Sequence, residues 1–185
     1  MFSLVILQSL FFFLPGFVAN MLPIVFDRYR VWVSLAQPVD FEHRLRGEFL
    51  FGTHKTWRGL FVGGLGGTLT AGFQTLLYAL VPQSHFLFLF RYDSFEVMWF
   101  GFLLGLGALL GDLTKSFFKR RLHIKDGAAF FPFDQLDYIV GGLFLGSFYF
   151  FPDWTHVVVL LVLTPVLTFL ANVIAYFWGW KKVWW

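Results

Sequence analysis

Three long stretches of the chain contain no Asp, Glu, Lys or Arg, and this feature constrains the fold more than any other. They cover residues 1–26, 59–90 and 154–180. A helix crosses the hydrocarbon core of a bilayer, roughly 30 Å thick, with about 20 consecutive apolar residues. The composition agrees, because 23% of the residues are aromatic and only 14% are charged, against roughly 25% charged in a soluble domain. A soluble fold of 185 residues could not bury 28 Phe and 8 Trp. The sequence therefore predicts one all-α integral membrane domain over residues 1–185.

The first uncharged stretch has some features of a secretory signal peptide, but it lacks a basic start and a small-residue cleavage site. It also contains Pro15, Gly16, Asn20 and Pro23. We therefore expect a first transmembrane helix over about residues 2–24, irregular near Pro15.

Two further apolar stretches, residues 97–111 and 138–152, are each about five residues too short to cross a bilayer alone. The first reaches full length only if its helix continues past Asp112 and Lys115, and the second only if its helix begins near Asp134. Carboxylates would then lie inside the membrane edge. Charged groups at that depth are costly, and they usually mark a functional site.

The chain is thus expected to cross the membrane five times. The expected spans are residues 2–24, 59–81, 95–118, 134–152 and 155–178, and the expected cytoplasmic loops are 27–58 and 119–133. This arrangement leaves 13 of the 14 Lys and Arg residues on one side and only Arg91 on the other. By the positive-inside rule, the amino terminus lies outside the cell membrane and the carboxyl terminus in the cytoplasm. Polar chemistry is then concentrated on the cytoplasmic face.

Pairs of glycines four residues apart recur in the expected spans, at 63 and 67, 101 and 105, 107 and 111, and 142 and 146. Such pairs let neighbouring helices approach closely. No GxxxxGK[ST] phosphate loop is present, and the absence of Cys excludes disulfides, thiolate nucleophiles and Cys-ligated metals. In the first loop, Phe41, Leu45 and Phe49 alternate with charged residues at helical spacing, which predicts a short interfacial helix over residues 41–51.

The densest polar constellation lies between Gly111 and Asp137. On a helix, Asp112, Lys115, Ser116 and Lys119 fall on one face. Asp134 and Asp137 are three residues apart, so their like charges need neutralisation. Hard carboxylate oxygens suit Mg²⁺, which usually keeps coordination positions for substrate phosphates. The basic residues that could then clamp phosphates are Lys115, Lys119, Arg120 and Lys125. A simpler interpretation is an Asp112–Lys115 ion pair beside an ordinary positive-inside cluster, which would leave Asp134 and Asp137 uncompensated.

A second constellation lies at residues 51–59, just before the second expected span. Lys55 and Arg58 could contact phosphates, Thr56 offers a hydroxyl, and Trp57 or His54 could stack on a base. The alternative is an interfacial Trp flanked by snorkelling cations. Asn20, in the first expected span, either acts as a ligand or forms a hydrogen bond that holds two helices together.

Three segments together resemble the CDP-archaeol synthases, small five-span relatives of the CDP-diacylglycerol synthases. They are Ser116–Asp137, LFGTHKTWRG and LPGFVANMLPI. The resemblance covers nearly the whole chain and implies transfer of CMP from CTP to a lipid phosphate within the bilayer, with Mg²⁺ and release of pyrophosphate. It further implies that Asp112, Asp134 and Asp137 are the metal-binding and catalytic carboxylates, and that Lys119 is a catalytic residue that holds a phosphate. Lys55, Arg58 and Arg120 would hold phosphates.

The diacylglycerol-type pattern has His-Gly-Gly before the paired Asp and an Arg between them, whereas here Phe133 precedes and Gln135 follows Asp134. This departure favours the archaeol-type branch. The competing function is a transporter or channel for an anionic lipid or an ion. A transporter usually has polar residues deep in several spans and internal symmetry, and the sequence shows neither.

Overall fold

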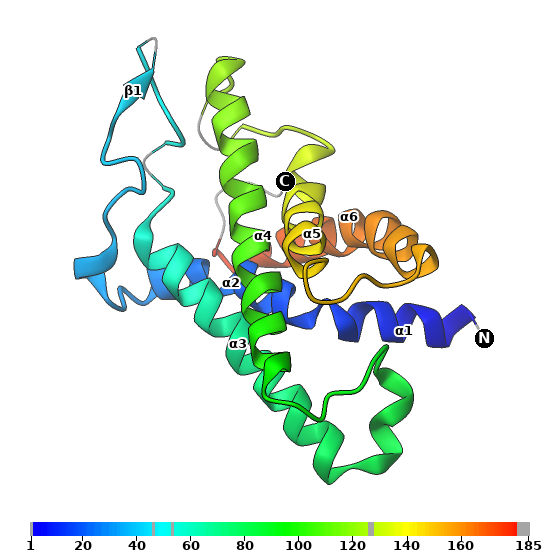
Figure 1. Ribbon diagram of the computed structural model, residues 1–185. Coiled ribbons are helices and arrows are strands. Elements are labelled where there is room, and N and C mark those ends of the chain that lie inside the picture. The colour runs from blue at the N-terminus through cyan, green and yellow to red at the C-terminus, as the bar shows by residue number, and fades with distance from the viewer. Residues whose placement is uncertain (1, 46, 53, 126–127, 181–185) are drawn as a thin grey trace.

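The computed structural model describes residues 2–45, 47–52, 54–125 and 128–180. Of the basic residues counted above, Arg46, Lys181 and Lys182 lie outside these ranges. The α-helices are α1 (Phe2–Phe12), α2 (Leu14–Arg28), α3 (Trp57–Leu80), α4 (Glu96–Arg121), α5 (Phe133–Gly146) and α6 (Trp154–Phe177). Two 3₁₀ helices, η1 (Val33–Leu35) and η2 (Pro82–Leu87), and two short strands, β1 (Arg44–Leu45) and β2 (Glu48–Phe49), complete the described elements (Figure 1).

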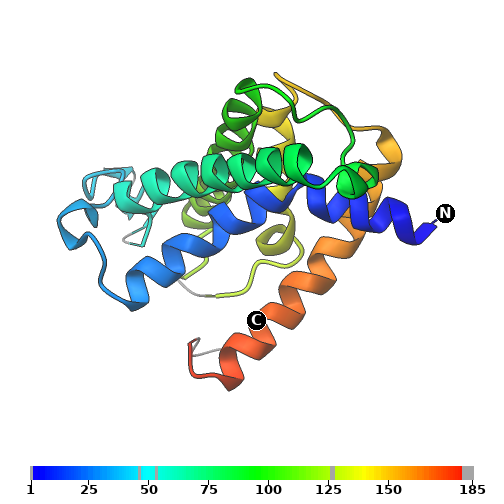
Figure 2. The same cartoon turned by 90° about the horizontal axis from the view of Figure 1, so that it is seen from below.

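Helix α4 stands at the centre of the molecule and packs against α2, α3 and α5, while α6 packs against α1 and α5 (Figure 1). Seen from below, α1 and α2 lie end to end and α2 runs beside α3 (Figure 2). The core is aromatic and aliphatic, with Phe13, Phe100 and Leu104 fully buried. The outer faces of α3 and α6 expose large apolar side chains, as expected where lipid replaces water.

Among the residues that the structure describes, three helices, α3, α4 and α6, are long and apolar enough to cross a membrane by themselves. The pair α1 and α2 qualifies as a fourth span, bent by 50°. Helix α5 has 14 residues and ends earlier than the expected span of residues 134–152. Five spans and the orientation of the termini therefore stay predictions.

The break between α1 and α2 has a local cause. Pro15 has no backbone N–H, so it cannot donate to the carbonyl of Phe11 one turn earlier. The buried side chain of Gln74 from α3 donates to this carbonyl instead, at 2.6 Å. The expected irregularity near Pro15 is thus present as a helix break that α3 stabilises.

The glycine pairs do bring helices together. A Cβ at Gly67 would lie 2.3 Å from the carbonyl oxygen of Gly101, and one at Gly107 would lie 2.4 Å from that of Gly141. Larger side chains there would push α3 or α5 away from α4. These contacts confirm the predicted helix packing.

The interfacial helix predicted for residues 41–51 is wrong, because β1 and β2 form an antiparallel hairpin there. Gly47, with a φ of 85°, supplies the left-handed turn conformation that a tight hairpin requires. Asp40 is buried and accepts hydrogen bonds from the backbone N–H groups of Glu42 and Phe51. Arg121 at the end of α4 donates to the carbonyl of Phe49 at 2.6 Å, so the hairpin is fixed to α4.

Candidate active site

The last turns of α4 and the first turn of α5 form the polar centre of the molecule. Asp112, Lys115 and Lys119 come from α4, and Asp134 and Asp137 come from α5. The two helices approach closely here because of Gly111, where a Cβ would lie 2.1 Å from the backbone oxygen of Asp137. A glycine on α4 therefore brings the carboxylates of the two helices together.

The ammonium group of Lys115 lies among all three carboxylates. Its Nζ is 3.0 Å from Asp112 Oδ1, 3.1 Å from Asp134 Oδ1 and 2.7 Å from Asp137 Oδ2. Lys55 pairs with the other oxygen of Asp112, and Lys119 lies 3.3 Å from Asp134 Oδ1. We refer to Asp112, Asp134, Asp137, Lys55, Lys115 and Lys119 as the carboxylate–lysine cluster.

This cluster corrects one expectation from the sequence. An ion pair between Asp112 and Lys115 does form, but it does not leave Asp134 and Asp137 uncompensated, because the same ammonium contacts both. The side chain of Lys115 is 13% exposed and that of Asp137 only 5%. Removing one member of such a buried group leaves an unpaired charge, which typically costs about 3–5 kcal/mol.

The three carboxylates fit Mg²⁺ by chemistry, since each places a hard oxygen within 3.1 Å of one point. That point is occupied by the Lys115 ammonium. Within the described ranges, no group of three or more His, Cys, Asp or Glu side chains is arranged to hold a metal ion. A metal could bind these carboxylates only after the ammonium moves.

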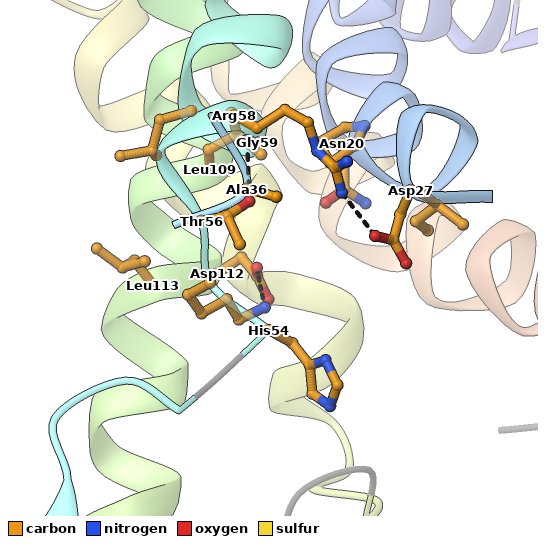
Figure 3. A pocket seen from close by; sticks show the side chains of 14 residues that line it. Asn20, Asp27, Ala36, His54, Thr56, Arg58, Gly59, Leu109, Asp112 and Leu113 are labelled. Carbon is orange, nitrogen blue, oxygen red and sulfur yellow. Dashed lines mark hydrogen bonds and ion pairs between the residues drawn. The ribbon is translucent and has the colours of Figure 1, made fainter. Parts of the chain in front are cut away.

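A polar pocket of about 530 Å³ opens on one side of the cluster, between α2, α3, α4 and the loop before α3 (Figure 3). Asp112 forms part of its wall, together with Asn20, His54, Lys55 and Thr56. Thr56 caps α3 by accepting a hydrogen bond from the Gly59 N–H at 3.2 Å. The positive end of the α3 dipole adjoins the pocket, and such helix ends favour anions.

Arg58 lines the same pocket but is already engaged. Its Nη2 donates to Asp27 Oδ1 at 2.6 Å and its Nη1 to the Val31 carbonyl at 3.2 Å, which ties α3 to α2 (Figure 3). Sequence reasoning missed Asp27, whose only signal is its position directly after the first uncharged stretch. The phosphate-binding role of Arg58 stays a prediction.

An apolar groove of about 920 Å³ runs along α4 and α5. Its walls include Leu110, Phe118, Val140 and Phe144. Lys115 and Asp137 also line this groove. The cluster therefore adjoins a polar pocket through Asp112 and an apolar groove through Lys115 and Asp137.

The remaining candidate residues are dispersed. Trp57 is 45% exposed, packs against Phe41 and does not line the polar pocket. The hydroxyl of Ser116 donates to the Asp112 backbone carbonyl, one turn earlier in α4. Arg120 is buried, and Lys125 is exposed beyond the end of α4.

Sequence comparisons identify relatives over the whole chain. A family model described as CarS-like CDP-archaeol synthase matches residues 1–185. The CDP-archaeol synthase of Pyrococcus furiosus is 37% identical over 183 residues, which cover 97% of this chain and 98% of that protein. The CDP-archaeol synthase of Methanococcus maripaludis is 35% identical and covers 98% of both chains.

A solved structure of an intramembrane enzyme for archaeal membrane lipid biosynthesis has a similar fold, with a TM-score of 0.69 and 28% sequence identity. The match covers 90% of this chain and 94% of that one. Fold and sequence comparisons thus point to the same group of proteins.

Proposed function

Because this chain belongs to the CDP-archaeol synthase family, we propose that it transfers CMP from CTP to an archaeol-type lipid phosphate at the carboxylate–lysine cluster. The chain is a CTP-dependent lipid cytidylyltransferase and a multi-pass membrane protein, as its relatives and its structural neighbour indicate. A transporter or channel is not favoured. What we propose beyond this is which residues carry out the transfer, that Mg²⁺ takes part, and that the acceptor is of the archaeol type.

The observation that carries the proposal is the position of the cluster between two cavities of opposite character. A nucleoside triphosphate suits the polar pocket, because Lys55 is cationic and the amino end of α3 is electropositive. A lipid suits the apolar groove, with its chains against α4 and α5 and its phosphate near Lys115. The two substrates would then approach the cluster along separate routes.

The transfer itself joins an oxygen of the lipid phosphate to the α-phosphorus of CTP. The bond from that phosphorus to the bridging oxygen of the β-phosphate breaks, and pyrophosphate leaves with the electron pair. A phosphomonoester already carries about 1.5 to 2 negative charges, so no strong general base is needed. The main task of the protein is to position two polyanions and offset their repulsion.

The lysines of the cluster perform most of that task in this proposal. Lys55 holds the triphosphate, while Lys115 and Lys119 neutralise the lipid phosphate and the departing pyrophosphate. When bound by Asp112, Asp134 and Asp137, Mg²⁺ would supply charge neutralisation of the phosphates. The chemistry of the three carboxylates supports this assignment.

We also propose a topology of five spans, in which α1 and α2 count as one span and α5 as a short fifth. The amino terminus lies outside, and the cluster faces the cytoplasm. The distribution of Lys and Arg supports this orientation.

The direct test is transfer of label from CTP to lipid by the purified protein in liposomes. We expect Mg²⁺-dependent labelling of an unsaturated archaetidic acid in preference to phosphatidate, and no labelling in EDTA. Asp134→Asn should abolish transfer while the protein still folds. Near-normal transfer by that variant would refute the site assignment, and preference for phosphatidate would refute the archaeol-type acceptor.

A further inference from the structure

Lys115 has an unusual position for a residue that binds a substrate phosphate. An ammonium awaiting a phosphate is normally open to solvent, whereas this one is 13% exposed and already contacts three carboxylates. The buried Oδ2 of Asp137 has no hydrogen-bond partner of good geometry. The negative charge of this oxygen is offset by the Lys115 ammonium, 2.7 Å away.

We propose that Lys115 is a resident counter-ion, which holds Asp112, Asp134 and Asp137 together before substrates bind and is displaced when a divalent cation takes its place. This inference rests on the proposed function for the identity of the cation. It assigns Lys115 a different role from a permanent phosphate clamp.

The distances between Lys115 Nζ and the carboxylate oxygens indicate that a divalent cation must replace the ammonium rather than bind beside it. Mg²⁺ binds carboxylate oxygens at about 2.0–2.1 Å, and the same oxygens now surround Nζ at 2.7–3.1 Å. Two cations cannot share that centre, because their repulsion would be large in a site screened from water. Lys55 and Lys119 can stay, since each contacts only one of the carboxylates. Lys55 pairs with the Asp112 oxygen that Lys115 does not contact, and Lys119 lies 3.3 Å from Asp134 Oδ1.

The displaced ammonium group of Lys115 can move into the apolar groove. Lys115 lines the apolar groove, in which we place the lipid acceptor. Movement of its flexible side chain toward the groove would bring the positive charge to the lipid phosphate when the metal arrives. Lys115 would thus become available to the lipid phosphate only after metal binding, which couples metal binding to lipid binding.

The decisive experiment measures Mg²⁺ binding by calorimetry and thermal stability without nucleotide or lipid. The variants are Lys115→Met, which keeps most of the side-chain length but removes the charge, and Arg91→Met, which removes an exposed cation that is not part of the cluster. In EDTA, Lys115→Met should lower Tm by about 5 °C or more, because three carboxylates lose their shared partner. Saturating Mg²⁺ should restore that loss, and Lys115→Met should bind Mg²⁺ at least ten-fold more tightly than the unmodified chain. Arg91→Met should change neither quantity.

Equal or weaker Mg²⁺ binding by Lys115→Met would overturn the proposal, as would the absence of Mg²⁺ binding in both proteins. If the variant does not fold, the unmodified protein provides a second test. Acetylation by a small amine-reactive reagent, followed by mass spectrometry, should label Lys115 slowly in EDTA and at least several-fold faster with Mg²⁺. Unchanged labelling at a Mg²⁺ concentration that saturates the protein would also overturn it. Failure of CTP turnover alone would count against the proposed function and leave these metal-only measurements interpretable.

Discussion

The polar pocket and the apolar groove adjoin the same end of α4 but are built by different means. The pocket is assembled from helix ends and a loop, and ion pairs such as Arg58–Asp27 hold its walls together. The groove follows two helices that pack through glycine, with almost no polar wall beyond Lys115 and Asp137. A change in charge should therefore affect the pocket, and a change in shape should affect the groove. Only the cluster between them should respond to both.

Among changes that leave the cluster's own side chains intact, the largest effect is expected at Gly111, which lines the groove and sets how closely α5 approaches α4. Gly111→Ala places a methyl group where the backbone oxygen of Asp137 now lies, so α5 must move away from α4. A displacement of about 1 Å in a catalytic group can cost about 100-fold in rate, and we expect kcat, measured at saturating CTP and lipid, to fall by about that factor. Gly72→Ala is the control, since its nearest neighbour is 3.7 Å away. Equal activity of the two variants would show that helix contact at Gly111 does not position the carboxylates.

A smaller effect, confined to the polar pocket, is expected from Lys55→Met. The substitution removes a cation from the pocket while Asp112 keeps its contact with Lys115. Loss of one charge-assisted contact of about 1.4 kcal/mol corresponds to a ten-fold change. Steady-state kinetics should show KM for CTP raised about ten-fold and KM for the lipid unchanged. A rise in KM for the lipid instead would mean that Lys55 contacts the lipid and not CTP.

The groove permits the complementary experiment. Val140→Trp inserts a large ring between α4 and α5, and Val158→Trp on α6 is a matched control because both valines are 55% exposed. Val140 lines the groove and Val158 does not. We expect Val140→Trp to raise KM for the lipid about five-fold, a cost of about 1 kcal/mol typical of filling an apolar site, with KM for CTP unchanged. An identical response of the two variants would place the lipid elsewhere.

The sequence predicted those parts of the site that depend on helix periodicity. Asp112, Lys115 and Lys119 share a face of α4 because they lie three and four residues apart, and the short apolar stretches indicated that α4 and α5 carry charges. The shared ammonium was not predictable, because it depends on how closely α5 approaches Gly111. The hairpin at residues 44–49 was missed because apolar spacing suggested a helix, while Gly47 and the contacts of Asp40 decide otherwise.

For Trp57, the sequence and the packing suggest different roles, and its substitution has the smallest predicted effect. Its sequence position beside Lys55 and Arg58 predicts a stacking partner for the cytosine base, whereas its indole packs on Phe41 outside the polar pocket. If the pocket keeps this arrangement when CTP binds, Trp57→Leu should change KM for CTP by less than about two-fold, because base stacking worth about 1–3 kcal/mol is absent. A ten-fold increase, with the lipid KM unchanged, would mean that the loop before α3 rearranges around the nucleotide. The polar pocket would then be formed partly by its ligand, in contrast to a groove fixed by the packing of α4 and α5.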